Sequence, residues 1–175
     1  MKRISQERIW EEMKKAWKQA KDYRNYLAFF SKFDMWEQVF PGVEINTDLV
    51  NSKDFVVVFT NLFKNADTNR LETKLVQEFR IEIENVKKIV FLLELSKMNV
   101  EDVLDIFRKR QQCAITDATI LEWLRVSDNQ NDMLVKFIDY KPTTSSQELM
   151  SQGFKGKELG EEIKRLEIDK FKQML

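Results

Sequence analysis

Residues that interrupt helices are scarce in this chain, and this scarcity constrains the fold more than any other feature. Only four glycines and two prolines occur among the 175 residues. Glycine and proline are the two residues that weaken a helix most strongly. Long stretches therefore remain free to form helices, and apolar residues recur through them at the three- and four-residue spacing of a helix face. We predict an all-α fold, an irregular multi-helix bundle.

The longest predicted helix runs from about residue 5 to 30, and Ser5 is a suitable N-cap for it. Pro41-Gly42 ends a short second helix over 31–40. The segment 54–63 is ambiguous, because its β-branched residues would also suit a buried strand. No alternating partner strand lies nearby, so we predict a buried helix there. The remaining predicted helices cover 71–79, 82–99, 100–112, 117–126, 128–138, 147–150 and 157–170.

One linker-like stretch, Lys141-Pro142-Thr143-Thr144-Ser145-Ser146, divides the chain. We predict a long helix over 1–30, a helical body over 31–140, and a small helical tail module over 141–175.

The tail module contains three of the four glycines, all within 153–160, with Lys155 and Lys157 between them. A helical pattern follows at once. A helix N-terminus presents free N–H groups and a positive dipole end, and both attract anions. The simpler alternative for the glycines is a tight turn into a closely packed helix, with Gly160 leaving room for a neighbour.

The composition excludes several classes of function. Lysine plus arginine and aspartate plus glutamate each number 29, so the formal net charge of zero argues against a polybasic binder, although not against a local basic surface. The absence of histidine removes the commonest general base and metal ligand. The single Cys113 can form no internal disulfide or zinc site, which favours a reduced, cytoplasmic setting. No long apolar run suggests a membrane helix.

No motif for an independent active site is present. The Gly153–Gly156 stretch lacks the Gly-Lys-Ser/Thr of a P-loop, and no Asp-x-Asp pair occurs. Glu82 and Glu84 are spaced like metal ligands, but a solvated or capping role fits a helix start better. The basic residues before Cys113 would lower a thiol pKa. Without a histidine, however, we favour a plain, partly buried thiol. We predict no catalytic or metal-binding residue in this chain.

Two further groups of residues have a structural and a functional interpretation. The basic residues at the end of helix 100–112 have two interpretations: they balance the negative end of the helix dipole, or they face a ligand. We favour the first, because cations are stabilising at a helix C-terminus. The basic residues are Arg108, Lys109 and Arg110. A run of aromatic residues would stack nucleic-acid bases or fill the core, and its helical spacing favours the core. These residues are Tyr23, Tyr26, Phe29, Phe30, Phe33 and Trp36.

Two ordered motifs carry a resemblance to a known family. Ile4-Ser5-Gln6-Glu7-Arg8-Ile9 resembles the Ser-x-Glu-Arg-Ile segment of the bacterial/eukaryotic-type CCA-adding tRNA nucleotidyltransferases and bacterial poly(A) polymerases. Glu148-Leu149-Met150-x-x-Gly153-x-x-Gly156-x-x-Leu159-Gly160-x-x-Ile163 is similar to the tail signature of that family. Phe40-Pro41 after a tryptophan-containing helix is similar to the start of its body. The resemblance covers essentially the whole chain.

The resemblance also implies what is missing. The family's catalytic head, with its Gly-Ser and Asp-x-Asp, and its base-reading Glu-Asp-x-x-Arg both precede the first motif. Glu101-Asp102 does not match the latter, because Asp105 stands where the arginine is needed. The chain therefore resembles the end of the neck, the body and the tail, as an expressed fragment, a split gene product or a stand-alone relative. Magnesium and CTP or ATP are expected only for the missing head, and no cofactor for this chain.

The family's body and tail hold the tRNA acceptor stem and elbow, which implies an RNA-backbone clamp here. The implied partners are tRNA and a catalytic head domain or split partner, with no membrane. Gly153, Lys155, Gly156 and Lys157 are the implied RNA-binding residues. The weaker candidates are Lys14, Lys18, Lys21, Arg108, Lys109 and Arg110.

Glu7 and Arg8 would form a structural ion pair at the junction of neck and body. Whether the whole protein would add CCA or poly(A) stays open. The alternative function is a helical protein–protein interaction scaffold without catalytic activity.

Overall fold

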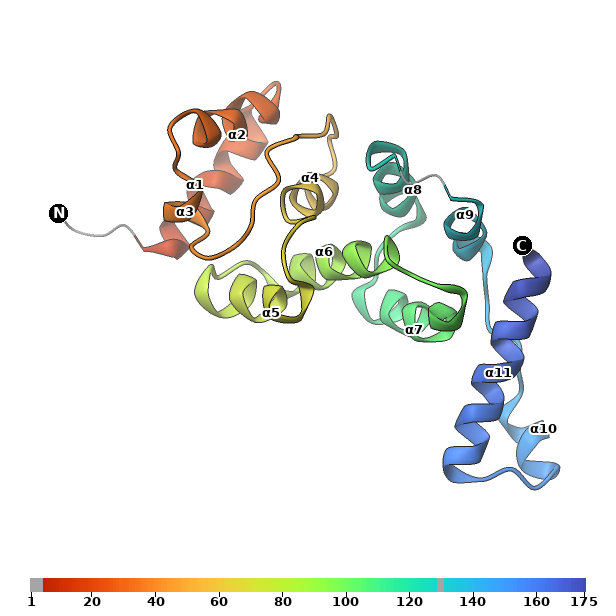
Figure 1. Cartoon of the computed structure of the whole chain (residues 1–175). Helices are drawn as coiled ribbons and strands as arrows, with labels where there is room; N and C mark the ends of the chain where they lie inside the picture. The colour runs from red at the N-terminus through yellow and green to blue at the C-terminus, as the bar shows by residue number, and fades with distance from the viewer. Residues whose placement is uncertain (1–4, 129–130) are drawn as a thin grey trace.

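The computed structural model describes residues 5–128 and 131–175, which form an all-α structure without strands (Figure 1). The helices follow one another along a curved body, from α1–α3 at one end through α6 in the middle to α10 and α11 at the other (Figure 1). Their bounds are α1 Gln6–Gln19, α2 Tyr23–Lys32, α3 Trp36–Val39, α4 Phe55–Leu62, α5 Thr68–Thr73, α6 Ile83–Leu95, α7 Val103–Cys113, α8 Asp117–Val126, α9 Asp132–Asp139, α10 Ser146–Ser151 and α11 Gly156–Met174. A π-helical turn, η1 (Lys74–Glu78), continues α5, and a 3-10 turn, η2 (Val100–Asp102), leads into α7.

The core is centred on α6, which packs against α4, α5 and α7. Helix α4 is enclosed so completely that every residue from Val56 to Leu62 is buried. Asp54 caps it by accepting a hydrogen bond from the Val56 N–H at 2.8 Å. This capping and enclosure explain why a β-branched segment is helical, and the prediction of a buried helix at 54–63 is confirmed.

The predicted single helix over 5–30 is wrong, because the chain breaks between α1 and α2. Ser5 does cap α1, accepting the Arg8 N–H at 3.3 Å. Asp22 then caps α2 by accepting the Arg24 N–H at 3.0 Å. The break lets Tyr23 fold back, so that its hydroxyl donates to the Met13 carbonyl at 3.2 Å. Tertiary packing therefore ends a helix that the apolar spacing alone would continue.

The predicted second helix over 31–40 also differs from the structure. Helix α2 continues to Lys32, and Asp34 then adopts a left-handed conformation (φ 52°) before α3 begins. We predicted that helix 128–138 starts at Asp128-Asn129-Gln130. Residues 129 and 130 lie outside the described residues. Asn131 caps α9, accepting the Met133 N–H at 2.8 Å.

The tail is joined to the body through the second half of α11. Phe171 is fully buried and its ring lies 5.3 Å from that of Tyr140. Lys164 forms a 2.8 Å ion pair with Asp105 of α7, and Lys136 of α9 donates to the Met174 carbonyl. The first half of α11 extends beyond the body together with α10 (Figure 1). Among the described residues, none of the helices combines the length and the apolar character needed to span a membrane.

Candidate nucleic-acid interface

The glycine turn between α10 and α11 is built from a helix-ending motif followed by a helix start. Gly153 has φ +101°, and its N–H donates to the Met150 carbonyl at 3.1 Å. The Phe154 N–H donates to the Leu149 carbonyl at 3.2 Å. This pair of bonds is the Schellman arrangement, in which a left-handed residue, usually glycine, follows the helix end. Gly156 is also left-handed (φ +55°) at the start of α11. The φ of Gly153 is rarely adopted by other residues, whereas that of Gly156 favours glycine but is also adopted here by Asp34.

Gly160 has a different environment from the one expected of a packing glycine. A Cβ added to Gly160 would meet nothing within 4 Å. The interpretation that Gly160 leaves room for a packed neighbour is therefore wrong for the described residues.

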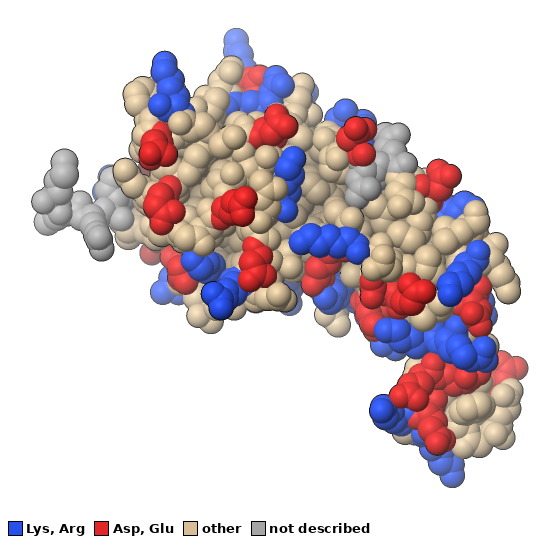
Figure 2. All heavy atoms as spheres, in the orientation of Figure 1, with Lys and Arg blue, Asp and Glu red and all other residues tan. Residues whose placement is uncertain are grey.

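The two lysines of the turn project into solvent. Lys155 is the N-cap residue of α11, is exposed, and forms no ion pair with a described residue. The Lys157 side chain is 91% exposed, and its only ion pair among the described residues is a 3.4 Å contact with Glu161. A pair this exposed holds the lysine weakly. On the face shown in Figure 2, acidic side chains lie among the basic ones at this end of the molecule, so that face shows no broad basic patch.

The lysines of the first helix are not equivalent. Lys14 pairs with Glu11 at 2.6 Å and with Glu82 at 2.5 Å, which ties α1 to the start of α6. Burial opposes its charge, but hydrogen bonds to these two carboxylates raise its pKa above the ordinary value. Lys18 and Lys21 are exposed and form no ion pair with any described residue. Lys14 therefore has a structural role, while Lys18 and Lys21 remain accessible.

The basic end of α7 is engaged in ion pairs with its neighbours. Arg108 pairs with Asp105 at 3.4 Å, and Lys109 pairs with Glu94 of α6 at 2.6 Å. Arg110 pairs with Asp117 of α8 and donates to the Ile138 carbonyl of α9 at 2.8 Å. The structure thus uses Lys109 and Arg110 to join α7 to three helices, whereas the partner of Arg108 lies on α7 itself. It does not gather the predicted basic residues into one surface, since they lie on α1, α7 and the α10–α11 turn, well separated along the body (Figure 1).

Sequence reasoning missed Glu167, the most densely hydrogen-bonded side chain of the tail. It is fully buried on α11. Its carboxylate accepts hydrogen bonds from the Tyr140 hydroxyl at 2.7 Å and from the backbone N–H groups of Thr143 and Thr144 at 3.0 and 2.7 Å. The Thr144 hydroxyl donates to the same group. Burial alone would raise the pKa of this carboxyl, but the donors outweigh burial and lower the pKa to about 2. Glu167 fixes the 141–146 segment onto α11.

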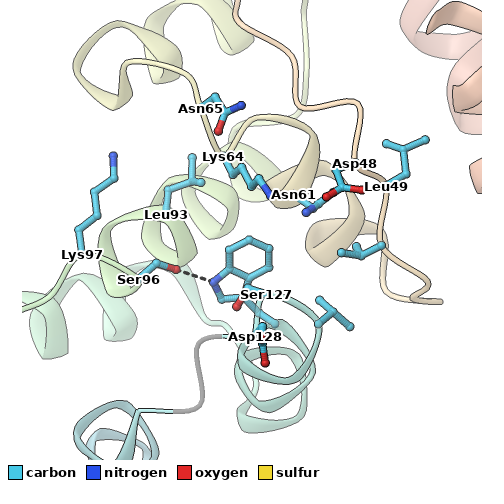
Figure 3. A pocket seen from close by; sticks show the side chains of 13 residues that line it. Asp48, Leu49, Asn61, Lys64, Asn65, Leu93, Ser96, Lys97, Ser127 and Asp128 are labelled. Atoms are coloured by element: carbon cyan, nitrogen blue, oxygen red, sulfur yellow. Dashed lines mark hydrogen bonds between the residues drawn. The ribbon is translucent and has the colours of Figure 1, made fainter.

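A polar pocket of about 650 Å³ also escaped sequence reasoning (Figure 3). It lies where the last turns of α4, α6 and α8 meet, and it is lined by Asn61, Ser96 and Ser127 among others. The indole N–H of Trp123 donates to the Ser96 hydroxyl at 2.8 Å (Figure 3). The Ser127 hydroxyl oxygen is buried and has no hydrogen-bond partner among the described residues. No cluster of acidic, histidine or cysteine ligands for a metal ion occurs in the described part of the chain.

Three smaller predictions concern single side chains. Cys113 is buried, and burial raises the pKa of its thiol. Cys113 is thus more deeply buried than the partly buried thiol that we predicted. Glu82 accepts hydrogen bonds from the Lys14 ammonium group and, at 3.0 Å, from the Trp10 indole N–H. Burial opposes the charge of this carboxylate, but the hydrogen bonds outweigh burial and its pKa is lowered. Glu7 and Arg8 form no ion pair within residues 5–128 and 131–175, so the expected pair is not seen there.

The aromatic run of α2 and α3 is divided between core and surface. Tyr23 and Trp36 are buried, and Tyr26 and Phe30 are partly buried. Phe29 and Phe33, by contrast, are 58% and 54% exposed. The prediction that the whole run belongs to the core is wrong for these two residues. They lie one helical turn apart, outside the contacts that α2 makes with the body.

Comparisons with known proteins identify no relative. No protein-family model, curated protein or solved structure matches the chain.

Proposed function

We propose that this chain is the RNA-binding body and tail of a CCA-adding-type tRNA nucleotidyltransferase, positioning tRNA for 3′-end nucleotide addition by a head domain that this chain does not contain. The observation that carries the proposal is the ordered pair of motifs at 4–9 and 148–163. In the first, Ser5 caps α1 and Ile9 packs against the core. In the second, Leu149 is buried and Gly153 closes the Schellman turn. Residues of both motifs therefore have structural roles in the fold, as a helix cap, as core contacts and as a turn.

The accessible cations support a phosphate-contacting role for the tail. Lysine ammonium groups contact the phosphates of helical RNA without reading its sequence. Lys155 and Lys157 are available for such contacts at the N-terminus of a 19-residue helix, where free N–H groups and the dipole favour an anion. Lys109 and Arg110 would have to break ion pairs with other helices first, so we assign them a minor part.

Filter binding of tRNA over a salt series tests the proposal. Each phosphate contact that is lost lowers the slope of log affinity against log salt by about one. Lys155→Ala/Lys157→Ala should therefore weaken binding and reduce the slope by about two. The matched control is Lys53→Ala/Lys87→Ala, which removes two exposed lysines of the body and should leave the slope unchanged.

Two results would contradict the proposal in different ways. Equal slopes for the tail variant and the control would remove the site assignment. Recovery of a protein partner without RNA in a pull-down would instead favour the interaction-scaffold function. Nucleotide incorporation into tRNA by the chain alone would contradict the inference that the catalytic residues lie elsewhere.

A further inference from the structure

The polar pocket at the ends of α4, α6 and α8 is lined by two side chains with unused hydrogen-bonding groups. Asn61 is only 2% exposed, and its side-chain oxygen Oδ1 accepts a hydrogen bond from the Asn46 amide at 3.2 Å. The amide nitrogen of Asn61 makes no hydrogen bond with a described residue, although Asn61 lines the pocket. The buried Ser127 hydroxyl, in the same pocket, also has no such partner. Buried polar groups are normally paired, so these two groups are available to a ligand.

Other polar side chains in the pocket wall are already engaged with each other. The Trp123 indole N–H donates to the Ser96 hydroxyl, and this hydroxyl donates to the Leu92 carbonyl at 2.9 Å (Figure 3). These bonds join the end of α6 to α8 and fix the wall between them. Asn61 belongs to α4, whereas Ser127 is the C-cap residue of α8. A ligand that meets both available groups therefore spans the pocket from one helix end to another.

The charges that line the pocket are balanced. Two lysines and two aspartates are present, namely Lys64, Lys97, Asp48 and Asp128. All four are exposed, and none of them forms an ion pair with a described residue. The lining therefore offers anions and cations in equal number, with no excess of either sign.

One charge of each sign lies beside Asn61. The Lys64 backbone N–H donates to the Asn61 carbonyl at 3.3 Å. The Asn46 amide donates to the Asp48 backbone carbonyl at 3.0 Å and to Asn61 Oδ1 at 3.2 Å. Figure 3 shows Asn61 between Lys64 and Asp48. An amide donor, a lysine and an aspartate therefore lie at the same end of the pocket.

The helix ends weigh against a purely anionic ligand. Helices α4, α6 and α8 all end at the pocket, and a helix C-terminus carries the negative end of the helix dipole. A phosphate would face these three ends as well as two carboxylates. A simple amine would suit those groups, but it would leave the Asn61 amide N–H and the two lysines without an acceptor. A ligand that carries one charge of each sign satisfies both sets of groups.

We propose that this pocket binds a small zwitterion of the α-amino-acid type, with a polar group at the end of its side chain. The ligand carboxylate accepts hydrogen bonds from the Asn61 amide and the Lys64 ammonium group. Its own ammonium group donates to the Asp48 carboxylate, and its side chain extends past Leu93 to the Ser127 hydroxyl. The volume of about 650 Å³ is in the range of small-molecule sites. The inference is independent of the proposed function, since it involves neither RNA nor the tail lysines.

Isothermal titration calorimetry tests the inference. The standard L-amino acids are titrated singly into the full chain, and at least one with a polar side chain should bind with a Kd below about 1 mM. Two derivatives of the tightest binder keep its side chain and lose one charge each. The N-acetyl derivative lacks the ammonium group, and the amide derivative lacks the carboxylate. Each derivative should bind at least about tenfold more weakly, because a charge-assisted hydrogen bond is lost.

Substitutions assign each ligand charge to a residue. Asp48→Asn should weaken binding of the amino acid and of its amide, but not of the N-acetyl derivative. Lys64→Met should weaken binding of the amino acid and of the N-acetyl derivative, but not of the amide. The matched control is Lys87→Met, which removes an exposed lysine of α6 outside this pocket and should leave all three affinities unchanged. The three substituted residues are exposed, so the variants should fold, which circular dichroism melting curves check.

Ser127→Ala separates binding from stability. It should weaken binding of the amino acid and leave the melting temperature no lower, because the buried hydroxyl has no hydrogen bond to lose. Failure of every amino acid to bind at about 10 mM would overturn the inference. A derivative that binds as tightly as its parent would also overturn it, because the pocket would then select a single charge. So would a parent affinity that neither Asp48→Asn nor Lys64→Met changes, because binding would then lie elsewhere.

Discussion

Substitution of Glu167 by glutamine should destabilise the protein in a manner that depends on pH. The buried carboxylate accepts hydrogen bonds from Tyr140, Thr143 and Thr144, and these hold its pKa at about 2 against an ordinary value of 4.5. A glutamine side chain keeps the size of the glutamate but cannot carry the charge that these donors stabilise.

The lowered pKa gives the size and the sign of the effect. Each pKa unit between folded and unfolded states corresponds to about 1.4 kcal/mol, so the Glu167 carboxylate contributes about 3 kcal/mol to the free energy of unfolding near neutral pH. Because the folded-state pKa is lower than the unfolded one, this stability is fully present above pH 4.5. It is lost as the pH falls from about 4.5 to about 2.

Urea denaturation followed by circular dichroism measures this contribution. The difference in unfolding free energy between wild type and Glu167→Gln should be greatest at pH 7 and should shrink across pH 4.5 to 3. Glu158→Gln, an exposed substitution on the same helix, is the matched control and should follow wild type at every pH. A difference between wild type and Glu167→Gln that stays constant from pH 7 to pH 3 would refute the reasoning.

Two further substitution or labelling experiments address the core. Asp54→Ala should lower the free energy of unfolding by about 1–2 kcal/mol, because Asp54 caps α4 and also accepts the Thr119 hydroxyl at 2.8 Å. Urea denaturation measures this change, and a loss below about 0.5 kcal/mol would show that the cap is dispensable. Cys113 should react with iodoacetamide much more slowly in the native protein than in urea, because its thiol is buried and burial raises its pKa. Equal rates in the two states, measured by mass spectrometry, would contradict that burial.

The sequence was sufficient to predict the helical class, because helix-breaking residues are scarce and caps are local signals. Ser5 was predicted as an N-cap, and its side chain accepts the Arg8 backbone N–H. The break between α1 and α2 was not predictable in the same way. No glycine or proline marks it, and the apolar spacing continues through Ala20 to Tyr23. The helix ends there because Tyr23 packs back on Trp17, with ring centroids 4.5 Å apart, and only the tertiary structure contains that contact.

The candidate site shows a stricter limit on sequence reasoning, because a charge count does not say which charges are free. Lys14 is partnered by Glu82, 68 positions away. Lys109 and Arg110 are likewise engaged by residues of other helices. Glu167 lies in a charged stretch that reads as a solvated face, yet its partners at 140–144 bury it.

Long-range pairing therefore removes three of the eight predicted cations, Lys14, Lys109 and Arg110, from the pool available to phosphates. The accessible lysines that remain from the predicted set are Lys18 and Lys21 at one end of the body and Lys155 and Lys157 at the other (Figure 1). Two phosphate contacts at each end give only a modest salt-dependent affinity. An RNA that reaches both ends gains more, because its second contact becomes intramolecular once the first is made. We therefore expect tight binding to require an RNA of sufficient length, and not a high density of positive charge at either end.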